Sequence, residues 1–129
     1  MNDKKIDRSL ALLDPVPMQE AFGEIDEMAL ETYGIFLSTT EPLLDEMGEC
    51  LRAGDHEKAS EVAHSAKGAA RMTGAFQLAA VCGEIERLSK EGDIATALEW
   101  QVLVPAAFED VRRAIETVQT SGVFPQNAG

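Results

Sequence analysis

One histidine in this chain has neighbours that suit phosphoryl chemistry. His64 lies within the run AHSAKGAA, residues 63–70, which is typical of a helix. On a helix, residues three and four positions apart are neighbours on one face, so Lys67 and Gly68 lie beside His64. A neutral imidazole is a competent nucleophile near pH 7, because the free side chain has a pKa of about 6.5.

These neighbours meet the other requirements of phosphoryl transfer. In-line attack needs open space above the imidazole nitrogen, and Gly68 has no side chain to fill it. Transfer also needs positive charge near the phosphoryl oxygens. Lys67 supplies such a charge, and Arg71, seven residues after His64 on the same stripe, is a second candidate. We therefore interpret His64 as a phosphoryl acceptor.

The helix expected over residues 57–73 has two different faces. At about 100° per residue, one face gathers small and apolar side chains, which predicts close and rigid packing. The other face carries His64 at its centre, and one or both of Glu57 and Glu61 are candidates to hold the second ring nitrogen. The small face contains Ala59, Val62, Ala63, Ala66, Ala69, Ala70 and Thr73, and the polar face contains Glu57, Ser60, Glu61, His64, Lys67, Gly68 and Arg71.

Capping residues and glycines mark the other helices, and no segment has the period-two alternation of a strand. Pro42 predicts a break or bend near Thr39–Thr40, and Pro105 must kink or restart the last helix. The expected helices run from Asp14-Pro15 to Gly23, from Asp26 to Gly54, from Asp55 to about Thr73, over 75–91, and from Asp93 to about residue 120.

Short connections force neighbouring helices to run antiparallel. We therefore expect an all-α fold, an antiparallel up-down four-helix bundle with a short N-terminal helix packed at one end. The expected domain plan is a flexible lead-in over 1–13, the bundle over 14–120 and a disordered tail over 121–129.

Length and charge limit the classes of function. A chain of 129 residues suits one domain, and a net charge of -12 disfavours nucleic acid and anionic membrane surfaces as partners. Cys50 and Cys82 fall among apolar helical residues, so we expect them to be reduced and buried. No apolar run is long enough for a signal peptide or a membrane span. We expect a cytoplasmic monomer.

The residues around His64 resemble the signature of histidine-containing phosphotransfer (HPt) domains of bacterial two-component systems. The likeness extends more weakly from about Asp14 to Val118. Where the family usually has leucine, two residues after the histidine, this chain has Ala66, and we expect only a packing adjustment. The resemblance rests on residues 63–68, Gly74-Ala75, Leu78, Cys82, Ile85-Glu86 and Gly92-Asp93.

The resemblance implies a relay of phosphoryl groups and no enzyme activity. His64 would accept the group from a receiver-domain aspartate or a hybrid histidine kinase and pass it to another response-regulator receiver, with Lys67 supporting the phosphate and Gly68 giving access. No cofactor is implied, since Mg²⁺ is expected only on the partner receiver. We expect partners to dock around His64, over Ser60, Glu61 and exposed apolar residues of the second helix, Met28 and Leu37.

Two other functions are compatible with a helical bundle. One is an adaptor that docks a kinase or receiver and inhibits it without transfer, and the set His64, Lys67 and Gly68 favours transfer over this. The other is a metal-dependent hydrolase, which the lack of paired Glu-x-x-His motifs disfavours. His56 follows a cap, and we interpret it as a surface residue.

Overall fold

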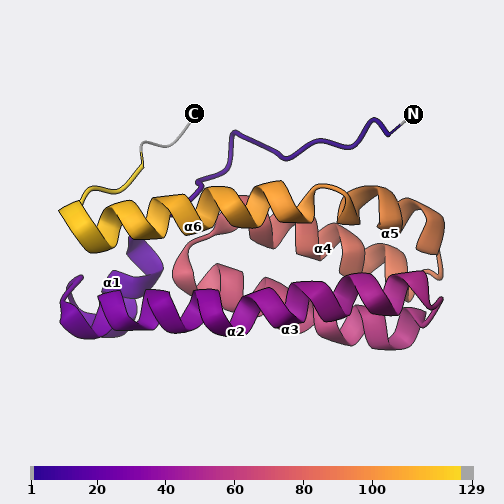
Figure 1. Cartoon of the computed structure of the whole chain (residues 1–129), viewed down its shortest axis with the longest axis horizontal. Coiled ribbons are helices and arrows are strands. Elements are labelled where there is room, and N and C mark those ends of the chain that lie inside the picture. The colour runs from indigo at the N-terminus through magenta and orange to yellow at the C-terminus, as the bar shows by residue number, and fades with distance from the viewer. Residues whose placement is uncertain (1, 126–129) are drawn as a thin grey trace.

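The computed structural model describes residues 2–125, in which every regular element is a helix and no strand is present. The all-α prediction is confirmed (Figure 1). The helices are α1 (Val16–Phe22), α2 (Glu27–Arg52), α3 (His56–Thr73), α4 (Phe76–Lys90), α5 (Ile94–Gln101) and α6 (Val104–Ser121).

The bundle has four helical positions, and α5 and α6 follow one another along the fourth position (Figure 1). The α3 helix packs mainly against α4 and α2, and the short α1 helix packs against α2 and α3 at one end. The predicted four-helix bundle with a short N-terminal helix is confirmed. Its central hairpin, α3 and α4, carries His64 and the residues that contact it.

Side-chain caps begin the long helices α2 and α3 and the short helix α5 where the sequence predicts a helix start. The carboxylates of Asp26, Asp55 and Asp93 each accept a hydrogen bond of 3.1 Å from the backbone amide three residues later. Each cap satisfies an amide that has no partner inside its helix. These ends are set locally, so the helix boundaries were predictable from the sequence.

Pro42 and Pro105, the two prolines expected to interrupt helices, have different effects on the helices that contain them. Pro105 lies in the first turn of α6 and separates it from α5, so the predicted restart is confirmed. Of the predicted break or bend near Thr39–Thr40, the break is wrong, because α2 continues unbroken through Pro42. Pro42 lies on the exposed side of α2, while buried side chains before and after it hold the helix against its neighbours. Packing therefore keeps α2 continuous where a hydrogen bond is missing.

The small face of α3 is buried as predicted except at Ala69, which is only partly buried. Ala59, Ala63, Ala66 and Ala70 are all fully buried, so the backbone of α3 can lie close to the neighbouring helices. Cys82 is buried in α4, and burial raises the pKa of its thiol to about 12. The central layer is therefore rigid and close-packed, which fixes α3 relative to α4.

The N-terminal segment lies along the bundle and contacts the turn between α3 and α4 (Figure 1). Leu13 is fully buried, and the Asp14 amide donates to the Gly74 carbonyl oxygen at 2.9 Å. The Gln77 side chain donates to the carbonyl oxygen of Leu10 at 2.9 Å. At the other end of the chain, the predicted tail falls partly on residues 126–129, which lie outside the described residues.

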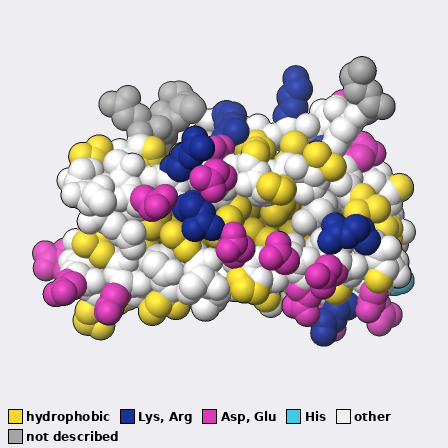
Figure 2. Space-filling view, in the orientation of Figure 1, with side chains coloured by type: hydrophobic (Ala, Val, Ile, Leu, Met, Phe, Trp, Pro, Cys, Tyr) yellow, Lys and Arg dark blue, Asp and Glu magenta, His cyan; other side chains and the backbone are white. Residues whose placement is uncertain are grey.

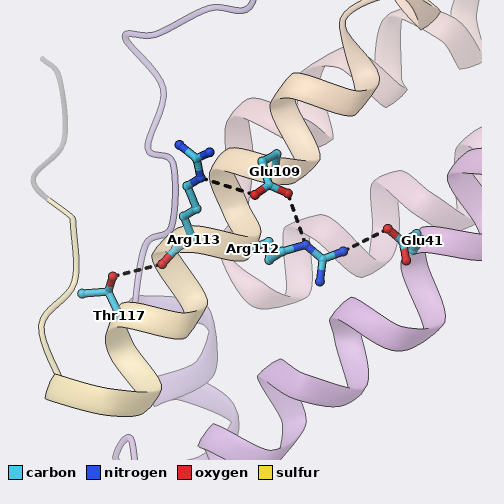
Figure 3. Close-up of polar contacts among 5 residues, drawn as sticks. All are labelled: Glu41, Glu109, Arg112, Arg113 and Thr117. Carbon is cyan, nitrogen blue, oxygen red and sulfur yellow. Dashed lines mark hydrogen bonds and ion pairs between the residues drawn. The ribbon is translucent and has the colours of Figure 1, made fainter.

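Charged side chains join the surfaces of α2 and α6. Arg112 of α6 contacts Glu41 of α2 at 2.9 Å and Glu109 of its own helix at 3.3 Å, while Arg113 contacts Glu109 at 3.3 Å (Figure 3). Each such exposed ion pair contributes little to the stability of the fold. Figure 2 shows the molecule in the orientation of Figure 1, with acidic side chains along the α2 edge. Among residues 2–125, no helix is both long and apolar enough to span a bilayer.

We predict that Gly74→Ala destabilises the fold strongly. Gly74 has a φ of 86°, and a Cβ there would collide with the carbonyl oxygen of Asp14. Gly92→Ala is a matched control, because Gly92 has a φ of 77° with nothing near its missing Cβ. Urea unfolding should show a loss of about 1–2 kcal/mol for the control. The loss for Gly74→Ala should be about 1–3 kcal/mol greater. Equal losses would show that the contact between Asp14 and Gly74 does not hold the turn.

Candidate functional site

The His64 side chain projects from the middle of α3 on the side opposite the buried alanines. Its side chain is 70% exposed. The helix beneath it is held by the close packing of the small face, so the position of the ring is set by a rigid element. The structure therefore presents an accessible imidazole on the long side of the bundle.

A glutamate from the neighbouring helix holds the ring. The Glu86 carboxylate of α4 lies 2.9 Å from His64 Nδ1, and its side chain is only 6% exposed. Burial alone would raise the pKa of Glu86, but hydrogen bonds from Lys67, Lys90 and His64 outweigh burial and lower the pKa to about 2. Glu86 is therefore ionised at neutral pH.

This contact fixes the tautomer of His64. An ionised carboxylate can only accept hydrogen bonds, so the proton of the neutral ring must lie on Nδ1. Nε2 then carries a free lone pair and points away from Glu86. The prediction that Glu57 or Glu61 orients the ring is wrong. Both lie exposed on the helix of His64 itself, while α4 packs beside α3 and brings its own carboxylate to the ring.

Glu86 had a weak signal in the sequence. It follows Cys82 by four positions and precedes Ser89 by three, so it belongs to the buried face of α4. A carboxylate on an otherwise apolar and small face needs partners in the fold. Which helix supplies those partners depends on how α3 and α4 align. The spacing of residues along the sequence does not predict that alignment.

Lys67 lies next to this carboxylate. Its Nζ is 2.5 Å from Glu86 Oε1. A Cβ built on Gly83 would lie 3.4 Å from the Lys67 side chain, an ordinary van der Waals distance, so the lysine stem passes alongside α4 at Gly83. In this structure Lys67 is bound to Glu86, which also binds His64. One carboxylate therefore connects the imidazole and its predicted cation.

Gly68 and Arg71 lie on the His64 side of α3, as the helix predicts. A Cβ at Gly68 would meet no atom within 4 Å, so the packing of the chain itself does not require glycine there. Mid-helix glycine costs about 1 kcal/mol relative to alanine. Arg71 is exposed, and its guanidinium has no hydrogen bond or ion pair with a described residue.

A shallow depression of about 320 Å³ lies beside the imidazole. Lys90, which the sequence analysis missed, borders it and places its Nζ 3.2 Å from Glu86 Oε2. Ser60 was expected to face outward for a partner, but this residue of α3 is buried, because α4 packs against α3. The depression is lined by Ser60, Glu61, His64, Glu86 and Lys90.

The apolar surface near the site differs from the predicted one. Met28 is exposed as expected, but Leu37 is partly buried, since it packs against the core beside Phe36. Ile35 and Met72 are the other large apolar side chains exposed nearby. They border a groove of about 300 Å³ between α1, α2 and α3, together with Met18, Phe22, Phe36 and Ala69.

The fold and the site together define a histidine phosphotransfer type of domain. The family model described as Hpt domain matches residues 31–119, and the chain belongs to this family. Histidine-containing phosphotransfer protein B (HptB) from Pseudomonas aeruginosa PAO1 has a similar crystal structure, with a TM-score of 0.76 and 25% identity. The similarity covers 84% of this chain and 95% of HptB. No curated protein matches the sequence. Residues 2–125 contain no cluster of ligands suited to a metal ion.

We predict that Glu86 makes the fold sensitive to acid. Because the folded pKa of about 2 lies below the ordinary value of 4.5, the stabilisation is complete above pH 4.5 and is lost as the pH falls towards 2. Unfolding free energies measured between pH 6 and pH 2 should fall less for Glu86→Gln than for the wild type. Glu57→Gln, an exposed glutamate on α3, is the control and should follow the wild type. Parallel profiles for wild type and Glu86→Gln would contradict the assigned charge state.

Proposed function

We propose that this protein is a phosphorelay intermediate that accepts a phosphoryl group on Nε2 of His64. The observation that carries the proposal is the 2.9 Å contact between Nδ1 and the ionised Glu86 carboxylate, on a ring that is otherwise exposed. It leaves Nε2 as the nucleophilic nitrogen, without a hydrogen bond to any residue in the described range 2–125. The donor is the phosphorylated aspartate of a receiver domain, and a second response-regulator receiver takes the group onward.

On this protein, the transfer step uses His64 and Glu86, and the receiver supplies the phosphorylated aspartate. The Nε2 lone pair attacks phosphorus, the phosphorus–oxygen bond to the aspartate breaks, and its electrons return to the aspartate carboxylate. The ring then carries a positive charge while the Nδ1 proton remains. Glu86 is already ionised and bonded to that nitrogen, so it balances this charge without reorganisation. Transfer back to a receiver reverses the same steps.

The neighbours of His64 support the transfer in different ways. Lys67 adds positive potential near the developing phosphoryl charge. Gly68 leaves space that the chain itself does not fill, so a receiver's active-site loops can approach Nε2. Arg71, exposed on the same stripe, reduces the local negative charge that faces an acidic receiver pocket.

The proposed partners dock on the long side of the bundle around His64. Met28, Ile35 and Met72 supply exposed apolar contacts, and Glu61 lies at the edge of the depression. Mg²⁺ belongs to the receiver pocket, and the protein itself needs no cofactor. The proposal includes a cytoplasmic location. It also includes a monomeric state, since in-line transfer uses one copy of the His64 site.

We predict that His64→Gln abolishes uptake of phosphoryl label and leaves the helical circular dichroism unchanged. The variant removes the nucleophile, while an exposed side chain contributes little to folding. The measurement is transfer of acid-labile ³²P from phosphorylated receiver domains. Lys67→Ala should slow transfer without abolishing it, because it removes a charge and keeps the nucleophile.

His56→Gln is the control, because His56 is the other histidine of the chain and lies at the exposed start of α3. It should take up label as the wild type does. Label on His64→Gln, or its loss in His56→Gln, would contradict the proposal. Receiver binding by an unlabelled wild-type protein would instead indicate the inhibitory adaptor.

A further inference from the structure

Glu86 binds two ammonium groups, which is one more cation than a single carboxylate requires. Lys67 contacts Oε1 and Lys90 contacts Oε2. With a neutral imidazole, the cluster of Glu86, Lys67 and Lys90 has a net charge of +1. One lysine can therefore leave the carboxylate and still leave it paired.

The two lysines are held to different degrees. The Lys67 side chain is 19% exposed, its nitrogen lies 2.5 Å from Oε1, and its stem lies against Gly83. The Lys90 side chain is 65% exposed, and its nitrogen lies 3.2 Å from Oε2. Burial and a short contact make Lys67 the fixed partner, while exposure and a longer contact make Lys90 the mobile one.

Lys90 is also the lysine that borders the open space at His64. It lines the depression beside the imidazole, whereas Lys67 does not. Lys90 and His64 Nδ1 contact the same oxygen atom, Oε2, so the ammonium lies close to the ring. A lysine stem has four rotatable carbons, and rotation can move the nitrogen several ångströms without moving α4.

We propose that Lys90 is a second phosphoryl-support residue, whose ammonium turns from Glu86 to the phosphoryl oxygens when His64 is phosphorylated while Lys67 remains on Glu86. This inference rests on the proposed function and extends it. The phosphoryl group adds about two negative charges beside an ionised carboxylate, and their repulsion has to be offset. The exchange breaks one ion pair and forms another, with no further covalent step.

Glu86 stays paired after the exchange. Lys67 still balances its charge, and the Nδ1 proton still donates to Oε2. Glu61 is the other carboxylate that lines the depression, and it competes with the phosphoryl group for Lys90. A dianion attracts the ammonium more strongly than one exposed carboxylate does, so the phosphorylated state favours the exchange.

The test is the equilibrium constant for phosphoryl exchange between a receiver domain and this protein. Lys90→Gln should shift the equilibrium towards the phosphorylated receiver by about threefold to fivefold, which is typical of one partly exposed charge pair. Lys90→Arg should restore most of the wild-type value, because it keeps the charge. Lys58→Gln, an exposed lysine in the first turn of α3, is the matched control and should leave the equilibrium unchanged.

A second measurement separates this role from a structural one. In the unphosphorylated protein, Lys90→Gln should leave Nδ1 as the protonated nitrogen of the His64 ring, because Lys67 still pairs with Glu86. Wild-type exchange by Lys90→Gln would overturn the inference and leave the proposed function intact. A proton moved from Nδ1 to Nε2 before phosphorylation would also overturn it, since Lys90 would then act through Glu86. Absence of label on the wild-type protein would instead overturn the proposed function itself.

Discussion

A buried, ionised carboxylate between two helices is the feature on which the rest of the site depends. A charge removed from water is tolerated only when it is paired and hydrogen-bonded. Glu86 meets this condition with three donors, His64 and Lys67 from α3 and Lys90 from α4. Because buried Glu86 must be paired and hydrogen-bonded, the nucleophile and both cations gather around its carboxylate.

This arrangement requires a fixed alignment of α3 and α4, and much of the fold serves it. The alanine face lets the two helices pack closely, and the turn at Gly74 is held by the backbone of Asp14. Leu78 and Ile85 are fully buried in α4, so Glu86 has a defined position along the helix. A shift of one residue in α4 would carry Glu86 to another side of the helix and separate it from the imidazole.

The surface near His64 combines a rigidly held cluster of charged side chains with an open area around it. The charge cluster is built on helices, which position side chains more firmly than loops do. Around it the protein leaves the space above Gly68 unfilled and leaves Met28, Ile35 and Met72 exposed. This combination suits a partner that binds transiently and completes the site with its own loops, as expected of a modest interface.

Local features were predictable from the sequence, and contacts between helices were not. The caps Asp26, Asp55 and Asp93 act within one turn, so spacing and residue type were sufficient to predict them. His64, Lys67 and Gly68 lie on one helix, so the helical period alone predicts that they share one face.

The roles of Glu86 and Lys90 depend on the alignment of a second helix, which periodicity does not specify. The exposure of Ser60 and Leu37 was mispredicted for the same reason. Each lies at the boundary between a polar and an apolar face, where the neighbouring helix decides burial. The continuous course of α2 through Pro42 likewise depends on tertiary packing.

The central claim is that Glu86 holds the proton on Nδ1 and leaves Nε2 to receive the phosphoryl group. Long-range ¹H–¹⁵N correlation of the His64 ring, before and after phosphorylation by a receiver, tests it most directly. We predict a protonated Nδ1 before transfer and phosphorus coupling to Nε2 afterwards. A proton on Nε2 before transfer, or a phosphoryl group on Nδ1 after it, would contradict the claim.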